Sequence, residues 1–523
     1  MASREFFRLA SGQRSIPMHN LADLSRLIDF SIRRDRADRR ARNEYDAGNT
    51  GRLRNDWGYT SDVPYNELAS KQEIMRSRSR DLYKNDYTYR AAINTVVQNA
   101  VGTGITPKPK VKINGVDRPD INKSIEENFW LYCRRNQWDA RQKSAWIGEG
   151  QRMALRTILV SGDVLLNKVP SKPGRLLPVA WQMFEADRLD NSKDVFTRNN
   201  YMSENVSQTM HGINIDAYGN PVSYWIKGID KAISASNIIH SYPIDRPEQY
   251  IGLPSAVAAL EAIFDKHDLL EDFVLKSRAI AKILNFLSNK NDKVPGTEDV
   301  SVDDFLKLEA LSTMRGDEPP QDVKFPDNVN DTVAPLVRIL EHGICSSLGT
   351  SYTTVTRNMD GVNFAASKFI SIQEWAFNKM LRSWFVEDHC DPFYERAIEM
   401  MIVTGKIKGV TSDQYAKSPA DYTYAEWTAV GKEDVDPEKD MNSDINGLKT
   451  GILSFADICA RRGKDKAEQI ETLKQEKKEF EDNGLPVLLG SELQPPSVEP
   501  VNPDNSSNPA APKTKRSDVY EMV

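Results

Sequence analysis

A long periodic run in the middle of the chain limits the possible architectures more than any other feature. Between Pro254 and Ser288, apolar side chains recur every three or four residues, as on one face of an α-helix. Proline suits the first turn of a helix, and at about 1.5 Å per residue this helix would be about 50 Å long. The positions on the predicted apolar face are Val257, Leu260, Phe264, His267, Leu270, Val274, Ser277, Ala281 and Leu284.

Charged side chains on the same run exclude a membrane-spanning helix. They are Asp265, Asp268, Glu271, Asp272, Lys276, Arg278 and Lys282. A helix of this length usually packs along a partner, so the run predicts a helix bundle or an oligomer. The first residues, from Met1 to Arg8, lead into no apolar run, and about 18 consecutive uncharged apolar residues occur nowhere. The protein is therefore expected inside the cell or in a particle made there.

The composition limits which classes of protein this chain can belong to. A chain of 523 residues with 39% hydrophobic content is long enough for two to four globular domains. Its net charge of -6 shows no excess of positive charge that would indicate tight nucleic-acid binding. A protein past which DNA slides need not be basic, because each neutralised phosphate adds affinity and drag. The cysteines have no metal-ligand spacing and are expected as reduced, buried thiols: Cys133, Cys345, Cys390 and Cys459.

The segment from Arg76 to Ile105 predicts a basic lead-in, a capped buried helix and a glycine stop. Asn85 or Asp86 can cap the helix, and Gly102 and Gly104 can end it, since glycine reaches the left-handed conformation cheaply. The arginines and serines of the lead-in are expected on a solvated face. The predicted buried positions are Tyr89, Ile93, Val96, Val97 and Ala100.

The following region predicts an α+β domain. Two helices are expected, over 121–138 and 144–160, with Ile125, Phe129 and Tyr132 buried on the first. Short strands are expected at Val164–Val169, Pro178–Phe184, Val222–Lys227 and Asn237–His240. Asp216 to Pro221 suit a hairpin turn, and His240, with no nucleophile spaced to join it, is predicted to be structural.

Beyond the long run the chain becomes irregular and then helical again. A short helix near Asp303–Leu311 and a strand ending at Phe325 are expected. Helices are then predicted at Thr332–Leu348, Ala366–Phe385 and Pro392–Val403, followed by a capping-box start at Ser454 and a last helix marked by Ile470, Leu473 and Phe480. From Gly484 onward, Pro, Asn and Ser predominate, which predicts a disordered tail.

The sequence contains no phosphate-binding loop, dinucleotide fingerprint, HExxH or GxSxG motif. Catalytic residue types cluster at His389-Cys390-Asp391, but adjacent residues point in different directions, so packing or capping is expected. The acidic pairs Asp303-Asp304 and Glu185/Asp187 could hold a metal with partners from elsewhere. Helix N-terminal charge and turn formation are their predicted roles. No catalytic, cofactor-binding or metal site is predicted.

Several motifs, in order, resemble the lambda-type portal proteins of tailed phages. The first comprises Arg76, Arg78, Arg80, Leu82, Asn85, Tyr87, Ala91, Ala92, Ile93, Val97, Asn99, Val101, Gly102, Gly104 and Ile105. Others are Ile238-Ile239-His240, the run Arg246 to Pro254, and Trp427 with Val435-Asp436-Pro437. Phe364, Ala365 and Ala366 replace Tyr, Ser and Ser of the family pattern, so this chain lacks the hydroxyl groups of those three positions.

The resemblance implies a succession of regions along a predominantly helical α+β portal fold. They are an Arg-rich polar arm (1–44), a wing (45–253), a stem helix (254–288), a clip (289–328), a second stem helix (329–348), a tunnel loop (349–365), a tunnel helix with a return to the wing (366–435), a helical crown (436–484) and a disordered tail (485–523). About twelve identical subunits are expected to close a ring through heterologous contacts.

What the resemblance implies about function is a head-tail connector, not an enzyme. Double-stranded DNA would pass through the ring during packaging and ejection. The expected partners are the terminase large subunit, the major capsid and scaffold proteins, and a head-completion or tail adaptor protein, with no cofactor and no membrane. The expected location is the portal vertex of the virion, after assembly in the host cytoplasm. The alternative is a DNA-modifying or nucleotide-using enzyme with a site built from scattered acids.

The polar link from Gly349 to Asn363 would then face the DNA. Its hydroxyl and amide side chains offer weak contacts, and repeated weak contacts around a ring are compatible with sliding. The alternative role for Arg357 is an ion pair with Asp360 that shapes a surface turn. The candidate DNA-channel residues are Thr356, Arg357, Asn358, Asn363 and Lys368.

Overall fold

The computed structural model describes residues 64–69, 71–195, 208–283, 287–288, 315–316, 329–429, 431 and 437–484. The chain divides into two compact units, residues 1–67 and 68–523. The predicted arm, the tail and the helix and strand expected between 303 and 325 lie outside the described residues. Among those residues, no helix is both long and apolar enough to cross a bilayer.

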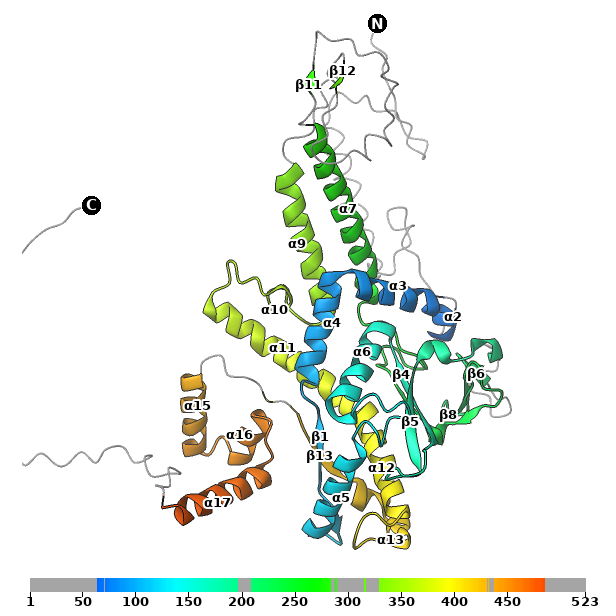
Figure 1. The fold of residues 1–523 in the computed structure, drawn as a ribbon, viewed down its shortest axis with the longest axis vertical. Coiled ribbons are helices and arrows are strands. Elements are labelled where there is room, and N and C mark those ends of the chain that lie inside the picture. Colours follow the sequence, from blue (N-terminus) through cyan, green and yellow to red (C-terminus); the bar gives the residue numbers. More distant parts are fainter. Residues whose placement is uncertain are drawn as a thin grey trace, which may run out of the picture. The chain divides into compact units, whose positions relative to one another are not determined.

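Helices α3 (Gln72–Asn85) and α4 (Tyr87–Ala100) stand at the centre of the second unit, after the short α2 (Pro64–Ala69) (Figure 1). The Asp86 carboxylate caps α4 by accepting a hydrogen bond from the Tyr89 N–H, as predicted. Gly102 and Gly104 have φ of 55° and 136°, which confirms the glycine stop. All five predicted core positions of α4 are buried.

The prediction that the arginines and serines before α4 lie on a solvated face is wrong for two of these residues. Arg76 and Ser79 lie on the buried face of α3, where Ser79 donates a hydrogen bond to the Val160 carbonyl and Arg76 donates one to the Ser161 carbonyl. The lead-in is itself a helix, so residues three or four apart, such as Arg76 and Ser79, share the face that points toward the end of α6. Their polar groups are tolerated there because each finds a hydrogen-bond partner.

The α+β region follows the predicted order with shifted boundaries. Helix α5 runs over Pro119–Tyr132 and ends earlier than predicted, because the chain turns at Cys133. Helix α6 (Gln151–Ser161) begins later than predicted, since Ile147 and Gly148 leave helical geometry in the π-turn Trp146–Gly150. Gly162, with φ of 99°, ends α6.

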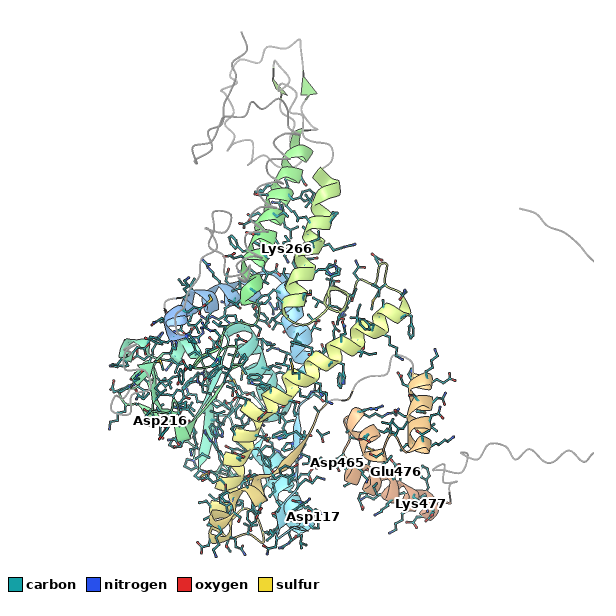
Figure 2. All side chains as sticks on the ribbon, turned by 180° about the vertical axis from the view of Figure 1, so that it is seen from behind. Asp117, Asp216, Lys266, Asp465, Glu476 and Lys477 are labelled. Carbon is teal, nitrogen blue, oxygen red and sulfur yellow. The ribbon has the colours of Figure 1, made fainter. Side chains whose placement is uncertain are left out.

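Two antiparallel sheets complete this region. One has the order β10-β4-β5, formed by Ile238–Ser241, Val164–Pro170 and Val179–Glu185. The other has the order β6-β7-β8-β9, formed by Gln208–Met210, Ile213–Ile215, Pro221–Tyr224 and Ile233–Ser234. Asp216, labelled in Figure 2, accepts hydrogen bonds from the backbone N–H groups of Tyr218 and Asn220, so these contacts confirm the predicted hairpin turn. The predicted strand to Lys227 ends at Tyr224.

Helices α7 (Leu260–Ile283) and α9 (Val329–Ser347) run side by side away from α4 (Figure 1). The helix predicted from Pro254 begins only at Leu260, because a 3₁₀ turn at Val257–Ala259 precedes it. At its other end, Leu287–Ser288 is a two-residue strand, β11, paired with β12 (Arg315–Gly316), and not helix as predicted. Helix α9 matches its prediction closely.

The second half of the chain is mostly helical. The elements are α10 (Tyr352–Thr356), α11 (Phe364–Phe385), α12 (Asp391–Val403), α13 (Ser412–Lys417), α14 (Pro419–Thr423), α15 (Pro437–Thr450), α16 (Phe455–Arg461) and α17 (Lys466–Asp482). Strand β13 (Ala425–Thr428) returns to pair with β1 (Thr106–Pro109), and β2 (Lys112–Ile113) pairs with β3 (Val116–Asp117). The predicted capping box at Ser454 is present.

Candidate assembly surfaces and channel segment

Helix α11 carries apolar side chains on the side that faces away from its own subunit. Phe369, Ile372 and Met380 are exposed by 60%, 50% and 65%, and their spacing places them on one face. On another side of the helix, Phe377 and Leu381 pack against the core. An exposed apolar stripe of this kind is typical of a protein-contact surface.

The helices α7 and α9 also expose apolar side chains. Phe264 and Val274, which belong to the predicted apolar face of α7, are exposed, whereas the buried positions include Ile263 and Lys266. Part of the predicted apolar stripe therefore lies on the outer face of α7, whereas Leu260 of the same stripe is buried with Ile263 in the core, and α7 also packs on α9. On α9, Leu336 and Ile339 are also exposed.

A buried cation fixes the place where α4, α7 and α9 meet. The side chain of Lys266, labelled in Figure 2, has no exposed surface. Its ammonium Nζ lies 2.6 Å from Asp86 Oδ2 and 4.0 Å from Glu341 Oε1. It also donates to Thr88 Oγ1 at 3.0 Å, and Thr88 in turn donates to Glu341. Asp86, the cap of α4, thus also serves as the counter-ion of α7.

A second buried pair ties α3 to the β10-β4-β5 sheet. Arg76 donates two hydrogen bonds of 3.1 Å to the Asp163 carboxylate, which has no exposed side-chain surface. His240 Nε2 lies 3.3 Å from the same carboxylate, which agrees with the structural role predicted for this histidine. Burial, then the Arg76 charge, lowers the pKa of nearby His211 to about 4.

The acidic pair Glu185/Asp187 takes part in ion pairs, and not in the predicted turn alone. Arg80 of α3 pairs with both carboxylates, and Arg76 reaches Asp187. Among the described residues, no group of three or more His, Cys, Asp or Glu side chains has the geometry to hold a metal ion.

The cluster at His389-Cys390-Asp391 has packing roles. His389 is buried in the π-turn Val386–Cys390, bonds to Ser241 Oγ at 2.9 Å and stacks on Trp146. Burial lowers the pKa of His389 to about 3 and raises the pKa of the Cys390 thiol well above its usual value. A protonated thiol is a poor nucleophile, and Asp391 instead accepts a hydrogen bond from the Trp427 indole. All four cysteines are free and buried, as predicted.

The link between α9 and α11 is more ordered than a loop over 349–365. It contains α10, and α11 already begins at Phe364, where Asn363 caps it by accepting a hydrogen bond from the Ala366 N–H. The Glu374 carboxylate of α11 holds the start of the link by accepting hydrogen bonds from Thr350 Oγ1, the Ser351 N–H and Thr354 Oγ1. One side chain therefore sets the position of α10 relative to α11.

The structure places the five candidate channel residues on this link and the first turns of α11. Thr356 and Arg357 are exposed, and Arg357 is in the left-handed region with φ of 59°. Asn358 accepts a hydrogen bond from the Asp360 N–H. Within the described part of the chain, no ion pair joins Arg357 to Asp360. Lys368 differs from Arg357, because its ammonium lies 3.4 Å from the Asp440 carboxylate.

Sequence reasoning missed both buried charge clusters. Lys266 is not among the positions of the predicted apolar face, and Arg76 lies in a run of alternating arginines and serines. Their partners Glu341 and Asp163 are distant in sequence, so no local pattern could pair them. The one available signal was Asp86, which the sequence indicated as a cap.

Sequence similarity to known portal proteins extends over most of the chain. The family model for phage portal proteins of the lambda family matches residues 50–382. The probable portal protein of Halomonas phage phiHAP-1 is 24% identical over 481 residues, covering 87% of this chain and 90% of that protein. Portal protein B of Escherichia phage lambda is 24% identical over 126 residues, covering 23% of each chain.

Among solved structures, chains from gene transfer agent particles are similar to this one. A chain from the neck of the native particle, computed with C12 symmetry, has a TM-score of 0.35 and 14% identity, and the match covers 79% of this chain and 99% of that one. A chain from the virion of the native particle has a TM-score of 0.34 and 15% identity, covering 74% and 92%. Because the family model spans more than half of the sequence, this chain belongs to the lambda family of phage portal proteins.

Proposed function

We propose that copies of this portal protein close a ring of about twelve subunits at one capsid vertex, through which double-stranded DNA enters and leaves the head. The observation that supports assembly is the outward apolar stripe of α11. Burying side chains such as Phe369, Ile372 and Met380 would contribute about 1 kcal/mol or more each, which a free subunit leaves unused.

The α7/α9 pair would form the stem of this ring, and the segment between them the clip at which the terminase large subunit and a head-completion or tail adaptor protein dock. The α+β region would be the wing that meets capsid and scaffold proteins, and α15 to α17 the crown. Support comes from family membership and from the antiparallel helix pair that projects from α4.

Arg357 is the strongest candidate for contact with DNA in this ring. It is exposed, and no described carboxylate neutralises it, so each subunit would present one free cation on the link. Lys368 would contribute less, since Asp440 screens its charge. A ring of single cations touches successive phosphates without holding any one of them tightly.

Assembly can be tested by electron microscopy of the purified chain. Negative-stain images should show rings with a central hole, and the double variant Ile372→Glu/Met380→Glu should give subunits that no longer assemble. Val403→Glu is the matched control, because Val403 is an exposed apolar residue on α12 outside the stripe. A compact monomer for the wild-type chain at every salt concentration would refute the proposal.

The rings are expected to act as a conduit, with energy supplied by a separate motor. Purified rings should neither hydrolyse ATP nor cut DNA in the presence of magnesium. Turnover that copurifies with the rings and disappears on mutation of acidic residues of this chain would favour the enzyme alternative.

A further inference from the structure

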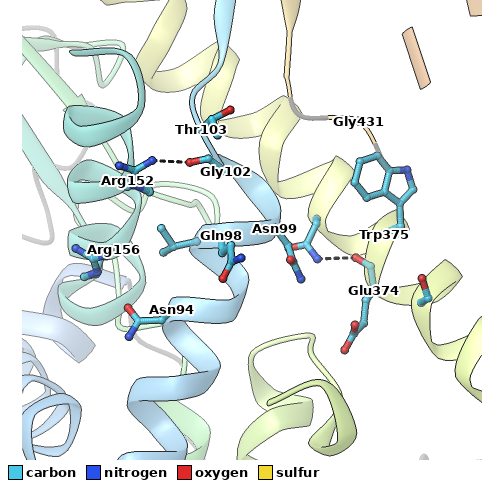
Figure 3. Close-up of a pocket in the computed structure, with 13 residues that line it drawn as sticks. Asn94, Gln98, Asn99, Gly102, Thr103, Arg152, Arg156, Glu374, Trp375 and Gly431 are labelled. Carbon is cyan, nitrogen blue, oxygen red and sulfur yellow. Dashed lines mark hydrogen bonds between the residues drawn. The ribbon is translucent and has the colours of Figure 1, made fainter. Parts of the chain in front are cut away.

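A polar groove crosses the surface of α4 between α6 and α11. Its volume is about 830 Å³. Figure 3 shows Asn94 and Gln98 of α4 between the arginines of α6 and Trp375 of α11. The residues that the argument uses are Gln98, Arg152, Arg156, Glu374, Trp375 and Asn378.

The groove carries positive charge that its own subunit does not neutralise. Arg152 and Arg156 are one helical turn apart on α6, and neither forms an ion pair with a carboxylate among the described residues. Arg152 donates to the Gly102 carbonyl, which is neutral (Figure 3). The carboxylate in the groove, Glu374, is already bonded to Thr350, Ser351 and Thr354. The arginines therefore favour an acidic occupant.

A buried amide in the groove wall indicates which class of acidic molecule the groove can bind. The side chain of Asn378 is 2% exposed and donates to the Glu374 carbonyl, but its Oδ1 has no partner among the described groups. This oxygen and the Glu374 carboxylate are acceptors, which would oppose a bare phosphate. A protein surface, which offers donors as well as carboxylates, fits the combination better than a nucleic-acid backbone does.

The same chain carries a matching acidic surface on α7. Its four residues recur with helical spacing on one exposed stripe, and none forms an ion pair within the described part of the chain; they are Glu261, Asp265, Asp268 and Asp272. The stripe lies on the side of α7 opposite to buried Ile263 and Lys266, so it faces away from its own subunit. Like charges at this spacing destabilise an isolated helix, and cations from another surface would offset that cost.

We infer that the groove over α4 binds the acidic stripe of α7 from a second copy of this chain. The geometry suits this pairing, because Arg152 and Arg156 have the same four-residue spacing as Asp268 and Asp272, about 6 Å along each helix. Exposed Phe264 on α7 and Trp375 in the groove supply an apolar contact beside the charges. The inference rests on the proposed ring and names one of its subunit contacts.

Charge reversal with rescue tests the pairing. Arg152→Glu/Arg156→Glu, and separately Asp268→Lys/Asp272→Lys, should each raise roughly tenfold the protein concentration at which half of the chains are assembled, measured by sedimentation velocity. The variant that carries all four changes should assemble at nearly the wild-type concentration. Arg156→Glu alone is included because it leaves the Arg152 bond to Gly102 intact.

The outcomes separate this contact from the ring itself. Wild-type chains that never assemble would refute the proposed function. Two results would overturn the groove contact while leaving the ring in place: wild-type chains form rings and a charge-reversed double variant assembles as well as they do, or the variant with all four changes assembles no better than the double variants. Two other results for the charge-reversed variants would also overturn the groove contact. Loss of DNA binding with unchanged assembly would indicate that nucleic acid occupies the groove, and loss of monomer stability alone would indicate that another segment of the same chain occupies it.

Discussion

Replacing Lys266 with methionine tests the buried charge cluster at the junction of α4, α7 and α9. Methionine is close to lysine in length and packs in apolar surroundings, so the substitution removes mainly the ammonium. The Asp86 carboxylate would lose a partner at 2.6 Å, and Glu341 would lose the nearby ammonium but keep the hydrogen bond from Thr88. Both carboxylates would stay buried.

Leaving buried carboxylates without their cation is costly. Removing one partner of a buried ion pair typically costs about 3–5 kcal/mol, so we expect Lys266→Met to lower the free energy of unfolding by that amount. Neutralising all three charged groups of the cluster should lower the free energy of unfolding much less. The triple variant Asp86→Asn/Lys266→Met/Glu341→Gln should recover most of the loss, and asparagine still caps α4.

Urea titration followed by tryptophan fluorescence, at one fixed protein concentration, measures these differences. Lys417→Met is the matched control, because Lys417 is an exposed lysine on α13 with no ion pair to another described residue, and its replacement should change stability by no more than about 0.5 kcal/mol. A loss below about 1 kcal/mol for Lys266→Met, or a triple variant no more stable than the single one, would refute the reasoning.

Three further predictions follow from particular contacts. Because the folded pKa of His389, about 3, lies below its unfolded value, this histidine should make the protein less stable as pH drops from about 6.5 toward 3, whereas buried Asp388, with a pKa raised to about 6, has the opposite effect. Since His389→Asn removes the histidine contribution, its melting temperature should fall less steeply with pH over this range than that of the wild type. Arg357→Ala should form rings but package DNA poorly in a salt-dependent way, whereas Asp360→Ala should not; equal mild effects in counts of filled heads would exclude the channel role. Gly252→Ala should cost about 2 kcal/mol or more, because a Cβ there would lie 2.0 Å from the Gly162 carbonyl oxygen, while Gly115→Ala, with φ of 78° and open space, should cost only about 1 kcal/mol in the same denaturation assay.

Local chemistry determined the elements that depend on neighbours in sequence. The cap at Asp86, the glycine stop after α4, the Asp216 turn and the Ser454 capping box each involve groups within a few residues of one another. Such contacts form wherever the chain adopts the local conformation, so residue type and spacing suffice to predict them. The ordered motifs likewise indicated the portal family before any geometry was known.

Only the tertiary structure decided which faces are buried. Helical periodicity predicted an apolar stripe on α7, but Phe264 of that stripe is exposed, and the buried side of the helix contains Lys266. A lysine is buried there because Asp86 and Glu341 arrive from helices far away in sequence. The same holds for Arg76, whose partner Asp163 follows α6. Burial of a charge depends on the free energy of a long-range pair, and a one-dimensional pattern contains no information about that pair.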